Sequence, residues 1–370
     1  MFREVPVRRS RALLLNFEAD GIAGYDFLSR MSGHLHPTSI AILSAFSDWR
    51  PLSSCVSELS HKVGSYSVVA REVIRLLDYG FLIVAGTSLG DRNEKYDREW
   101  AWGPIAGLYH FSIKYTQYLD ASSSIAVMAE RVRTLPQISL FKTNAGDARV
   151  VSLPPPRDDG CFAVMKRRRS YRGFDGRPEA AITKEQLRDC LFSGLGIVGL
   201  AMTDIGELPL KMTPSGGARN PYEAYVFAYN VRNLPRGVYH YSALENSLAP
   251  TPLDKLPLVE AVLGGQVWFS GAAALILLVA NFARTAWKYR HPTGFRVVLI
   301  EAGHIAQNML LAATANDLAA APTCALDDAV IEDALDIDPV MESAIYAVAI
   351  GTRSEASTIA DLVDWSVVEH

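Results

Sequence analysis

Five cationic side chains fall within seven consecutive positions of this chain, from Lys166 to Arg172, and a serine lies among them. Guanidinium groups make forked, charge-assisted hydrogen bonds that match phosphate oxygens, and a serine hydroxyl adds a compact donor. The run therefore predicts a site for a multiply charged phosphate, and a solvated basic surface is the alternative that it leaves open. The candidate contacts in this run are Arg168, Arg169, Ser170 and Arg172.

A second polar string, from Thr213 to Glu223, contains two adjacent glycines. Glycines allow the backbone to approach a ligand closely and to point its N–H groups at it. We therefore predict a loop that holds a ligand ring or a phosphate, and an ordinary turn before a strand is the alternative. The candidate contacts in this string are Pro214, Ser215, Gly216, Gly217, Arg219 and Asn220.

Lys288 and Tyr289 stand side by side at the end of an apolar stretch that predicts a buried strand at 272–282. Both side chains can transfer protons, and their reference pKa values are about 10. A nearby cation and burial would have to lower the pKa of at least the lysine before it could accept a proton near neutral pH. Taken alone, this dipeptide is more typical of a surface position than of an active site.

A polar stripe marks a helix predicted at about 296–316, where His304, Gln307 and Asn308 follow the spacing i, i+3 and i+4. Buried polar groups must find partners, so the stripe predicts a structural network or a subunit interface. No second histidine or cysteine stands at ligand spacing from His304, and we expect no metal site. Gln307 of this stripe is also a candidate cofactor contact. Further candidate anion contacts are Pro322 and Thr323, in a predicted loop, and Arg353 after the last strand.

Residues 1–90 have the outline of a small winged-helix-like domain, in which Gly80 caps the second helix. That helix carries only Arg71 and Arg75 and lacks a basic stripe, so we expect a peptide or a partner protein and no nucleic acid. The predicted elements are a strand at 13–17, a turn at 21–25, helices at 35–46 and 66–78, and a strand at 81–84.

Residues 91–160 are predicted to form a connector whose many aromatic side chains pack the small domain against a large one. The connector ends in a linker at 146–160 that contains three consecutive prolines. Residues 161–370 have an α+β pattern, and Thr183 is a predicted helix N-cap with Gln186 three positions later. The predicted strands of this domain lie at 223–229, 237–241, 272–282 and 344–350.

Composition narrows the class of protein. A net charge of -4 and 49% hydrophobic residues are typical of a globular protein and give no reason to expect nucleic acid or an anionic membrane as partner. The four cysteines include no CxxC pair, which favours reduced thiols and a cytoplasmic location. The longest apolar run, 272–280, is too short to span a bilayer, and no signal peptide is expected.

Six segments, in chain order, resemble the nitroreductase superfamily and, more closely, its SagB/McbC-type branch, the thiazole/oxazole dehydrogenases or azoline oxidases. The resemblance covers about 162–353. The segments that carry it are RRSYRGF, PSGGARNPYEAYVFA, GVYHY, the Lys288-Tyr289 pair, EAGHIAQNMLLAA and YAVAIG.

This resemblance implies an FMN-dependent α+β three-layer sandwich with a central, mostly antiparallel sheet, assembled as a homodimer with each flavin at the subunit interface. It implies that Lys288 and Tyr289 carry azoline oxidation. The residues that match family contacts to the phosphate and ribityl chain are Arg168, Ser170, Arg172 and Arg353, with Arg169 beside them. Those that match the loop at the isoalloxazine ring are Pro214, Ser215 and Gly216.

The function implied by the resemblance is oxidation of thiazoline or oxazoline rings in a ribosomally made bacteriocin-type peptide, with a YcaO-type cyclodehydratase as partner. Two alternatives stay open. One is an NAD(P)H-dependent reductase of nitro compounds or quinones, which needs no peptide. The other is a subunit that binds the leader peptide within the modifying complex and has no redox role.

Overall fold

The computed structural model describes residues 5–19, 21–136, 158–203, 206–253 and 255–354. The chain divides into two compact units. The first unit comprises Met1–Lys114, Phe282–Val297 and Asp338–Glu342, and the second comprises Tyr115–Asn281, Val298–Ile337 and Ser343–His370. Most of the linker predicted at 146–160 lies outside the described residues.

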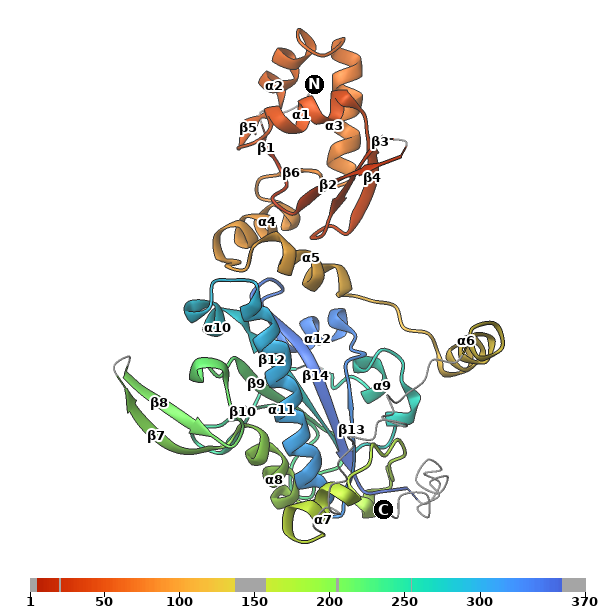
Figure 1. Ribbon diagram of the computed structural model, residues 1–370, viewed down its shortest axis with the longest axis vertical. Coiled ribbons are helices and arrows are strands. Elements are labelled where there is room, and N and C mark those ends of the chain that lie inside the picture. Colours follow the sequence, from red (N-terminus) through yellow and green to blue (C-terminus); the bar gives the residue numbers. More distant parts are fainter. Residues whose placement is uncertain (1–4, 20, 137–157, 204–205, 254, 355–370) are drawn as a thin grey trace, which may run out of the picture. The chain divides into compact units, whose positions relative to one another are not determined.

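The first unit contains two three-stranded sheets and a group of helices (Figure 1). One sheet has the order β5-β1-β6 and the other is the meander β2-β3-β4. Its strands are β1 (Pro6–Arg9), β2 (Leu13–Glu18), β3 (Gly21–Asp26), β4 (Met31–Leu35), β5 (Arg50–Pro51) and β6 (Leu82–Val84). Its helices are α1 (Pro37–Ala45), α2 (Leu52–Ser60), α3 (Tyr66–Asp78), α4 (Ser88–Glu99), α5 (Gly103–Ile113) and α10 (Phe282–Lys288).

The N-terminal region is not clearly a winged helix, which corrects the sequence-based outline. The helices α1 and α3 and the strand β6 lie where the sequence predicts them, but a whole meander intervenes between β1 and α1. The predicted turn at 21–25 is wrong, because this segment is the central strand β3, paired on both sides. A Cβ at Gly24 would lie 2.8 Å from the Phe81 ring, so this glycine serves close packing.

An aromatic cluster ties the end of α4 and the helix α5 to residues from the start of α10 and from the helix that follows it. The ring of Trp100 lies 5.6 Å from that of Phe282, and the ring of Trp102 lies 5.6 Å from that of Phe295. The indole N–H of Trp102 also donates a 2.7 Å hydrogen bond to the carbonyl of Tyr289. The cluster therefore fixes the backbone at one of the two predicted proton-transfer residues.

The second unit is built on a six-stranded sheet with the order β11-β10-β9-β12-β14-β13, and β7 and β8 form a separate ribbon. The strands are β7 (Ile197–Thr203), β8 (Gly206–Lys211), β9 (Tyr222–Ala228), β10 (Gly237–Ser242), β11 (Ser247–Pro250), β12 (Ala274–Asn281), β13 (Ala319–Thr323) and β14 (Glu342–Gly351). The helices are α6 (Ala121–Thr134), α7 (Gly160–Arg167), α8 (Lys184–Leu195), α9 (Val259–Val262), α11 (Thr293–Ala315) and α12 (Asp328–Leu335).

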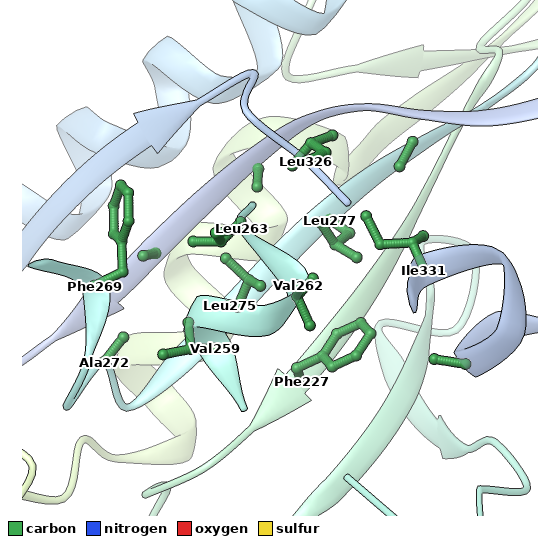
Figure 2. Packing of buried hydrophobic residues seen from close by; sticks show 14 of the residues in the cluster. Phe227, Val259, Val262, Leu263, Phe269, Ala272, Leu275, Leu277, Leu326 and Ile331 are labelled. Carbon is green, nitrogen blue, oxygen red and sulfur yellow. The ribbon is translucent and has the colours of Figure 1, made fainter. Parts of the chain in front are cut away.

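Helices cover both faces of this sheet, which confirms the predicted three-layer α+β sandwich. On one face, Tyr222 of β9 donates a hydrogen bond to the carbonyl of Val298 in α11, and α11 packs closely against Gly194 of α8. On the other face, side chains of β9 and β12 pack against α9 and α12 (Figure 2). Because both faces are covered, β12 is a nearly continuous apolar strand.

The helix α11 is long and apolar enough to cross a membrane on length and composition alone. About half of it faces the core, with 44% of its most apolar stretch buried. The core helix of a globular protein meets the same criteria, so they are a weak indication.

The start of α8 offers a test of local stability. Thr183 and Gln186 form the predicted capping box, with Thr183 Oγ1 accepting from the Gln186 amide at 3.2 Å and Gln186 Oε1 accepting from the Thr183 amide at 2.9 Å. We expect Thr183→Ala to lower the free energy of unfolding by about 0.5–2 kcal/mol, because the Gln186 amide N–H in the first turn of α8 loses its acceptor. Urea unfolding checks this, with Ser57→Ala on the exposed face of α2 as a control that should leave the midpoint almost unchanged.

Candidate functional site

The basic run lies where α7 ends, and the end of β14 lies beside it. Arg168 caps α7, and the following backbone joins the sheet region through a hydrogen bond from the Tyr171 amide to the Ala320 carbonyl. Phe174 forms a β-bridge with Arg353, whose guanidinium stacks over the Tyr171 ring at 4.6 Å. The fold therefore unites the predicted C-terminal anion contact with the basic run, although about 180 residues separate them.

The cations of this run differ in how they are neutralised. Lys166 pairs with Asp158 at 3.1 Å, and Arg167 pairs with Asp317 at 3.2 Å. Arg169 donates to the carbonyls of Lys166 and Arg168. Among the residues that the structure describes, no carboxylate pairs with Arg168 or Arg172.

A cluster of this kind fits a phosphate monoester. Arg168 is half-buried and Arg172 is exposed, so their charge is available to a ligand at the surface. Ser170 between them is half-buried and could add a hydroxyl donor. The residues expected to hold the phosphate of FMN are thus compatible with that group in their charge, chemistry and proximity.

The two-glycine loop follows β8 and leads into β9. Gly216–Ala218 form a single 3-10 turn, and the backbone of Gly217, Ala218 and Asn220 has positive φ angles of 61°, 55° and 48°. Glycine adopts this region most readily, so a side chain at Gly217 would disfavour the turn. The Asn220 side chain donates to the Ala218 carbonyl at 3.0 Å and supports the turn from within.

Glu301 of α11 anchors this loop, a role that sequence reasoning did not assign to it. Its Oε2 atom accepts from the Ser215 hydroxyl at 2.9 Å and from the Gly216 amide at 3.3 Å. Burial raises the pKa of the Glu301 carboxyl, an effect that the Ser215 hydrogen bond partly offsets. The sequence signal was the single acidic residue of a largely apolar helix, since a buried carboxyl requires a partner.

The basic run and the two-glycine loop lie far apart within the second unit. The loop contacts Glu301, while Arg167 of the basic run contacts Thr314 and Asp317 at the C-terminal end of α11. From 301 to 314 is 13 residues, which at about 1.5 Å each is roughly 20 Å along the helix. The strand pairing also separates the two segments. Tyr222, which follows the loop, pairs with the C-terminal end of β12. Ala273, just before β12 begins, donates its amide to the carbonyl of Ile350, which is close to Arg353 in the chain.

The predicted position of Lys288 and Tyr289 at a strand end is wrong. The strand β12 ends at Asn281, and the helix α10 carries the chain on to Lys288. The apolar pattern continues through Phe282 because its ring enters the aromatic cluster, which explains the overextended strand. Lys288 is exposed, Tyr289 is half-buried, and the Lys288 ammonium lies 5.6 Å from the Tyr289 ring centre.

The polar stripe of α11 divides into two parts. The Asn308 amide donates to the Ser193 carbonyl at 3.1 Å and to Thr213 Oγ1 at 3.2 Å, and this is the predicted structural network. His304 and Gln307 are exposed in the single chain. Thr213, buried between α8 and α11, is a further residue that sequence reasoning did not single out.

The predicted loop at Pro322 and Thr323 is part of the edge strand β13, in which Pro322 pairs with Val348. Proline is tolerated on an edge strand, where one side needs no donor. The Thr323 hydroxyl bonds to the Gln266 side chain and accepts from the Ala325 amide at 3.1 Å, so it stabilises a turn. This placement leaves any role in anion binding as a prediction.

A pocket of about 370 Å³ lies between α8 and the β10–β11 hairpin, and its lining includes none of the predicted flavin contacts. Within the described ranges, no group of three or more histidine, cysteine or acidic side chains could hold a metal ion.

The comparison with known families decides the wider identity. The model described as the nitroreductase family matches residues 165–352, which include the basic run, the two-glycine loop and β14. The chain belongs to the nitroreductase family. Members of this family are generally flavin oxidoreductases.

Individual relatives agree with this assignment. The chain is 34% identical over 151 residues to the trifolitoxin-processing protein TfxB of Rhizobium leguminosarum bv. trifolii, a match that covers 39% of this chain and 40% of TfxB. It is 32% identical over 194 residues to MJ1384 of Methanocaldococcus jannaschii, whose name assigns it to the nitroreductases, covering 52% and 92% of the two chains. The chain thus matches less than half the length of TfxB.

Among solved structures, the fold is similar to that of a chain in the E. coli microcin synthetase McbBCD complex with truncated pro-MccB17 bound. The TM-score is 0.52 at 19% sequence identity, and the match covers 73% of this chain and 99% of that chain. At this identity the likeness supports the fold.

Proposed function

We propose that this nitroreductase-family protein is an FMN-dependent dehydrogenase that oxidises thiazoline or oxazoline rings of a modified precursor peptide to thiazoles or oxazoles. The observation that carries the proposal is the union of the basic run with Arg353, where Arg168 and Arg172 have no carboxylate partner among the described residues. TfxB, named for trifolitoxin processing, and the McbBCD complex, which holds a truncated pro-peptide, support a peptide substrate.

Each group of residues has a distinct part in this proposal. Arg168, Arg172 and Arg353 hold the FMN phosphate by charge-assisted hydrogen bonds, with Ser170 as a further donor. The loop held by Glu301 brings its glycine backbone against the ring system. When bound, FMN supplies a two-electron oxidant that accepts a hydride from the ring carbon next to Cα. Lys288 or Tyr289 removes the Cα proton, so one proton and one hydride leave the azoline.

The separation of the basic run and the two-glycine loop supports a homodimer. The five-carbon ribityl chain of FMN is shorter than the roughly 20 Å along α11 that separates the loop from the basic run. We propose that the basic run of one copy and the two-glycine loop of another meet at one flavin in a C2 dimer. The exposed His304 and Gln307 of α11 then lie near the interface.

The partners complete the proposal. The N-terminal region contacts the precursor peptide or a YcaO-type cyclodehydratase, since it lacks a basic helix for nucleic acid. The reaction takes place in the cytoplasm, where the precursor peptide is made and the four cysteines stay reduced.

The cofactor is tested first. The purified protein should be yellow and release FMN on heating, and Arg168→Ala should weaken FMN binding by about 10- to 150-fold, because a charge-assisted contact contributes about 1.5–3 kcal/mol. Fluorescence titration of the apoprotein with FMN measures this. Arg188→Ala, whose guanidinium pairs with Asp189 on α8, is the matched control and should bind FMN normally. Release of FAD, or colourless protein that does not bind FMN, would contradict the assignment.

Activity is tested with an azoline-containing peptide under air, following the loss of two hydrogens per ring by mass spectrometry. Azole formation without NAD(P)H supports the dehydrogenase. Turnover of menadione with NADPH but not of the peptide would instead identify a reductase. Peptide binding by a protein that retains no flavin would identify a leader-binding subunit.

A further inference from the structure

The segment that carries Lys288 and Tyr289 is part of the first unit. That unit joins Met1–Lys114 with Phe282–Val297, so α10 and the start of α11 fold together with α4 and α5. Lys288 and Tyr289 stand where α10 ends, and the last carbonyls of a helix have no partner within it. The way in which this helix end is held therefore affects where both side chains point.

Both backbone groups of Tyr289 are held. Its amide donates to the Thr285 carbonyl of α10 at 2.9 Å, and its carbonyl accepts the indole N–H of Trp102 at 2.7 Å. Trp102 is only 1% exposed, and a hydrogen bond in such a dry setting is stronger than one in water. The main chain at Tyr289 is thus tied on one side to its own helix and on the other to the residue that precedes α5.

Gly294, in the first turn of α11, lies directly against this hydrogen bond. A Cβ at this position would be 2.6 Å from the indole nitrogen of Trp102, 2.8 Å from the Tyr289 carbonyl oxygen and 3.1 Å from Tyr289 Cβ. A side chain here would push these groups apart, so the glycine allows the three segments to meet. The contact between Trp102 and Tyr289 is therefore enclosed by α10, α11 and the start of α5.

Trp102 can act as a fixed donor because its ring is itself packed on several sides. The ring centre lies 5.4 Å from that of Trp100, 5.7 Å from that of Phe282 and 5.6 Å from that of Phe295. Phe282 is the first residue of α10, and Phe295 lies in the first turn of α11. The indole therefore contacts both ends of the segment on which Lys288 and Tyr289 stand.

We propose that Trp102 is a positioning residue for azoline oxidation, which sets the direction of the Lys288 and Tyr289 side chains through the Tyr289 carbonyl. This role rests on the proposed function and deepens it. A general base must lie within about 3 Å of the proton that it removes, and a misplacement of about 1 Å can cost about 100-fold in rate. The first unit then contributes to the chemical step, in addition to any contact with the peptide or a partner protein.

Trp102→Phe tests this role, because phenylalanine keeps an aromatic ring in the cluster but has no N–H for the Tyr289 carbonyl. In single-turnover reduction of the bound flavin by an azoline peptide, the rate constant at saturating peptide should fall about 10- to 100-fold. The peptide concentration that gives half of the maximal rate, and the affinity for FMN, should stay unchanged. Only folded protein with bound flavin gives this signal, so a loss of stability alone does not lower the rate constant.

Trp100→Phe is the matched control. The Trp100 indole N–H donates to the Gly103 carbonyl at 3.0 Å, so the substitution removes a hydrogen bond and ring volume from the same cluster without touching Tyr289. This variant should react at the wild-type rate. Equal slowing by Trp100→Phe and Trp102→Phe would show a general effect of packing and would overturn the positioning role.

Gly294→Ala perturbs the same hydrogen bond from the other side, and it keeps the test decisive if the Trp102 variant does not fold. Alanine is a good helix former, so the change costs little in α11 itself. Its methyl group would force Trp102 and the Tyr289 carbonyl apart, and the same slowing is expected. A wild-type rate in either folded variant overturns the proposal.

A double-mutant cycle separates this role from the function on which it rests. If Trp102 acts through the pair, Trp102→Phe should have no further effect in a chain that already carries Lys288→Ala and Tyr289→Phe. A further loss there, as large as in the wild-type background, would overturn the positioning role and leave the proposed base in place. A wild-type protein that binds FMN but oxidises no azoline peptide would overturn the proposed function, and the positioning role with it.

Discussion

Lys288→Ala and Tyr289→Phe are expected to abolish azole formation while the protein stays yellow and folded. Removal of a proton from Cα of an azoline needs a base held within about 3 Å of that proton, and loss of such a base typically costs 10²- to 10⁴-fold in rate. Neither side chain stabilises the core, since Lys288 is exposed and the structural contact of Tyr289 is its backbone carbonyl, held by Trp102. Both substitutions leave that contact in place.

The measurement is single-turnover reduction of the flavin by an azoline peptide, which isolates the chemical step from product release. Arg290→Ala is the control, because Arg290 is an exposed cation in the same segment. It should react at the wild-type rate. If Lys288→Ala and Tyr289→Phe both reduce the flavin as fast as the wild type, the pair is not the base and its adjacency is a surface feature. If only one is slow, that residue is the base.

Sequence patterns predicted the regular elements of the second unit well, because their signals are local. The capping box at Thr183 and the apolar run of β12 each depend on neighbours within a few residues. The cluster of guanidinium groups was equally visible, since its members are adjacent in the chain. From the sequence alone, Arg353 was only a separate anion candidate, because its place beside Tyr171 is set by the sheet.

The errors have a common physical origin in tertiary contacts. The segment at 21–25 has the glycines of a turn, but Gly24 allows the Phe81 ring to lie against strand β3. The Pro322 segment has the composition of a loop, but it forms an edge strand, which accepts proline. Glu301 was not assigned to the loop because its partners, Ser215 and Gly216, lie more than 80 residues earlier. No local pattern carries these pairings.

The separation of the basic run and the two-glycine loop could not be predicted either, since both have the composition of a ligand contact. Only the register of β9 on β12 and the contacts of α11 place them at opposite ends of the unit. This leads to an expectation that distinguishes a shared site from a site within one chain. Two different inactive variants should restore each other's activity when they assemble together.

For this test, a chain with Arg168→Ala and Arg172→Ala is co-expressed with a differently tagged chain carrying Gly217→Val. The first chain lacks the phosphate contacts, and the second carries a β-branched residue where the backbone has a φ of 61°. Each homodimer should bind little FMN. In a hybrid dimer, one site combines the intact basic run of the second chain with the intact loop of the first, while the other site carries both defects.

Random assembly in equal amounts makes half of the dimers hybrid, each with one intact site of two, so about a quarter of the wild-type flavin and activity should return. Purification through both tags should raise this to about half, because every dimer is then a hybrid. If the basic run and the loop of one chain held the same flavin, each chain in the hybrid would remain defective and nothing would return. Recovery in the doubly tagged fraction, absent from either variant alone, is therefore the result expected of a flavin shared between two copies.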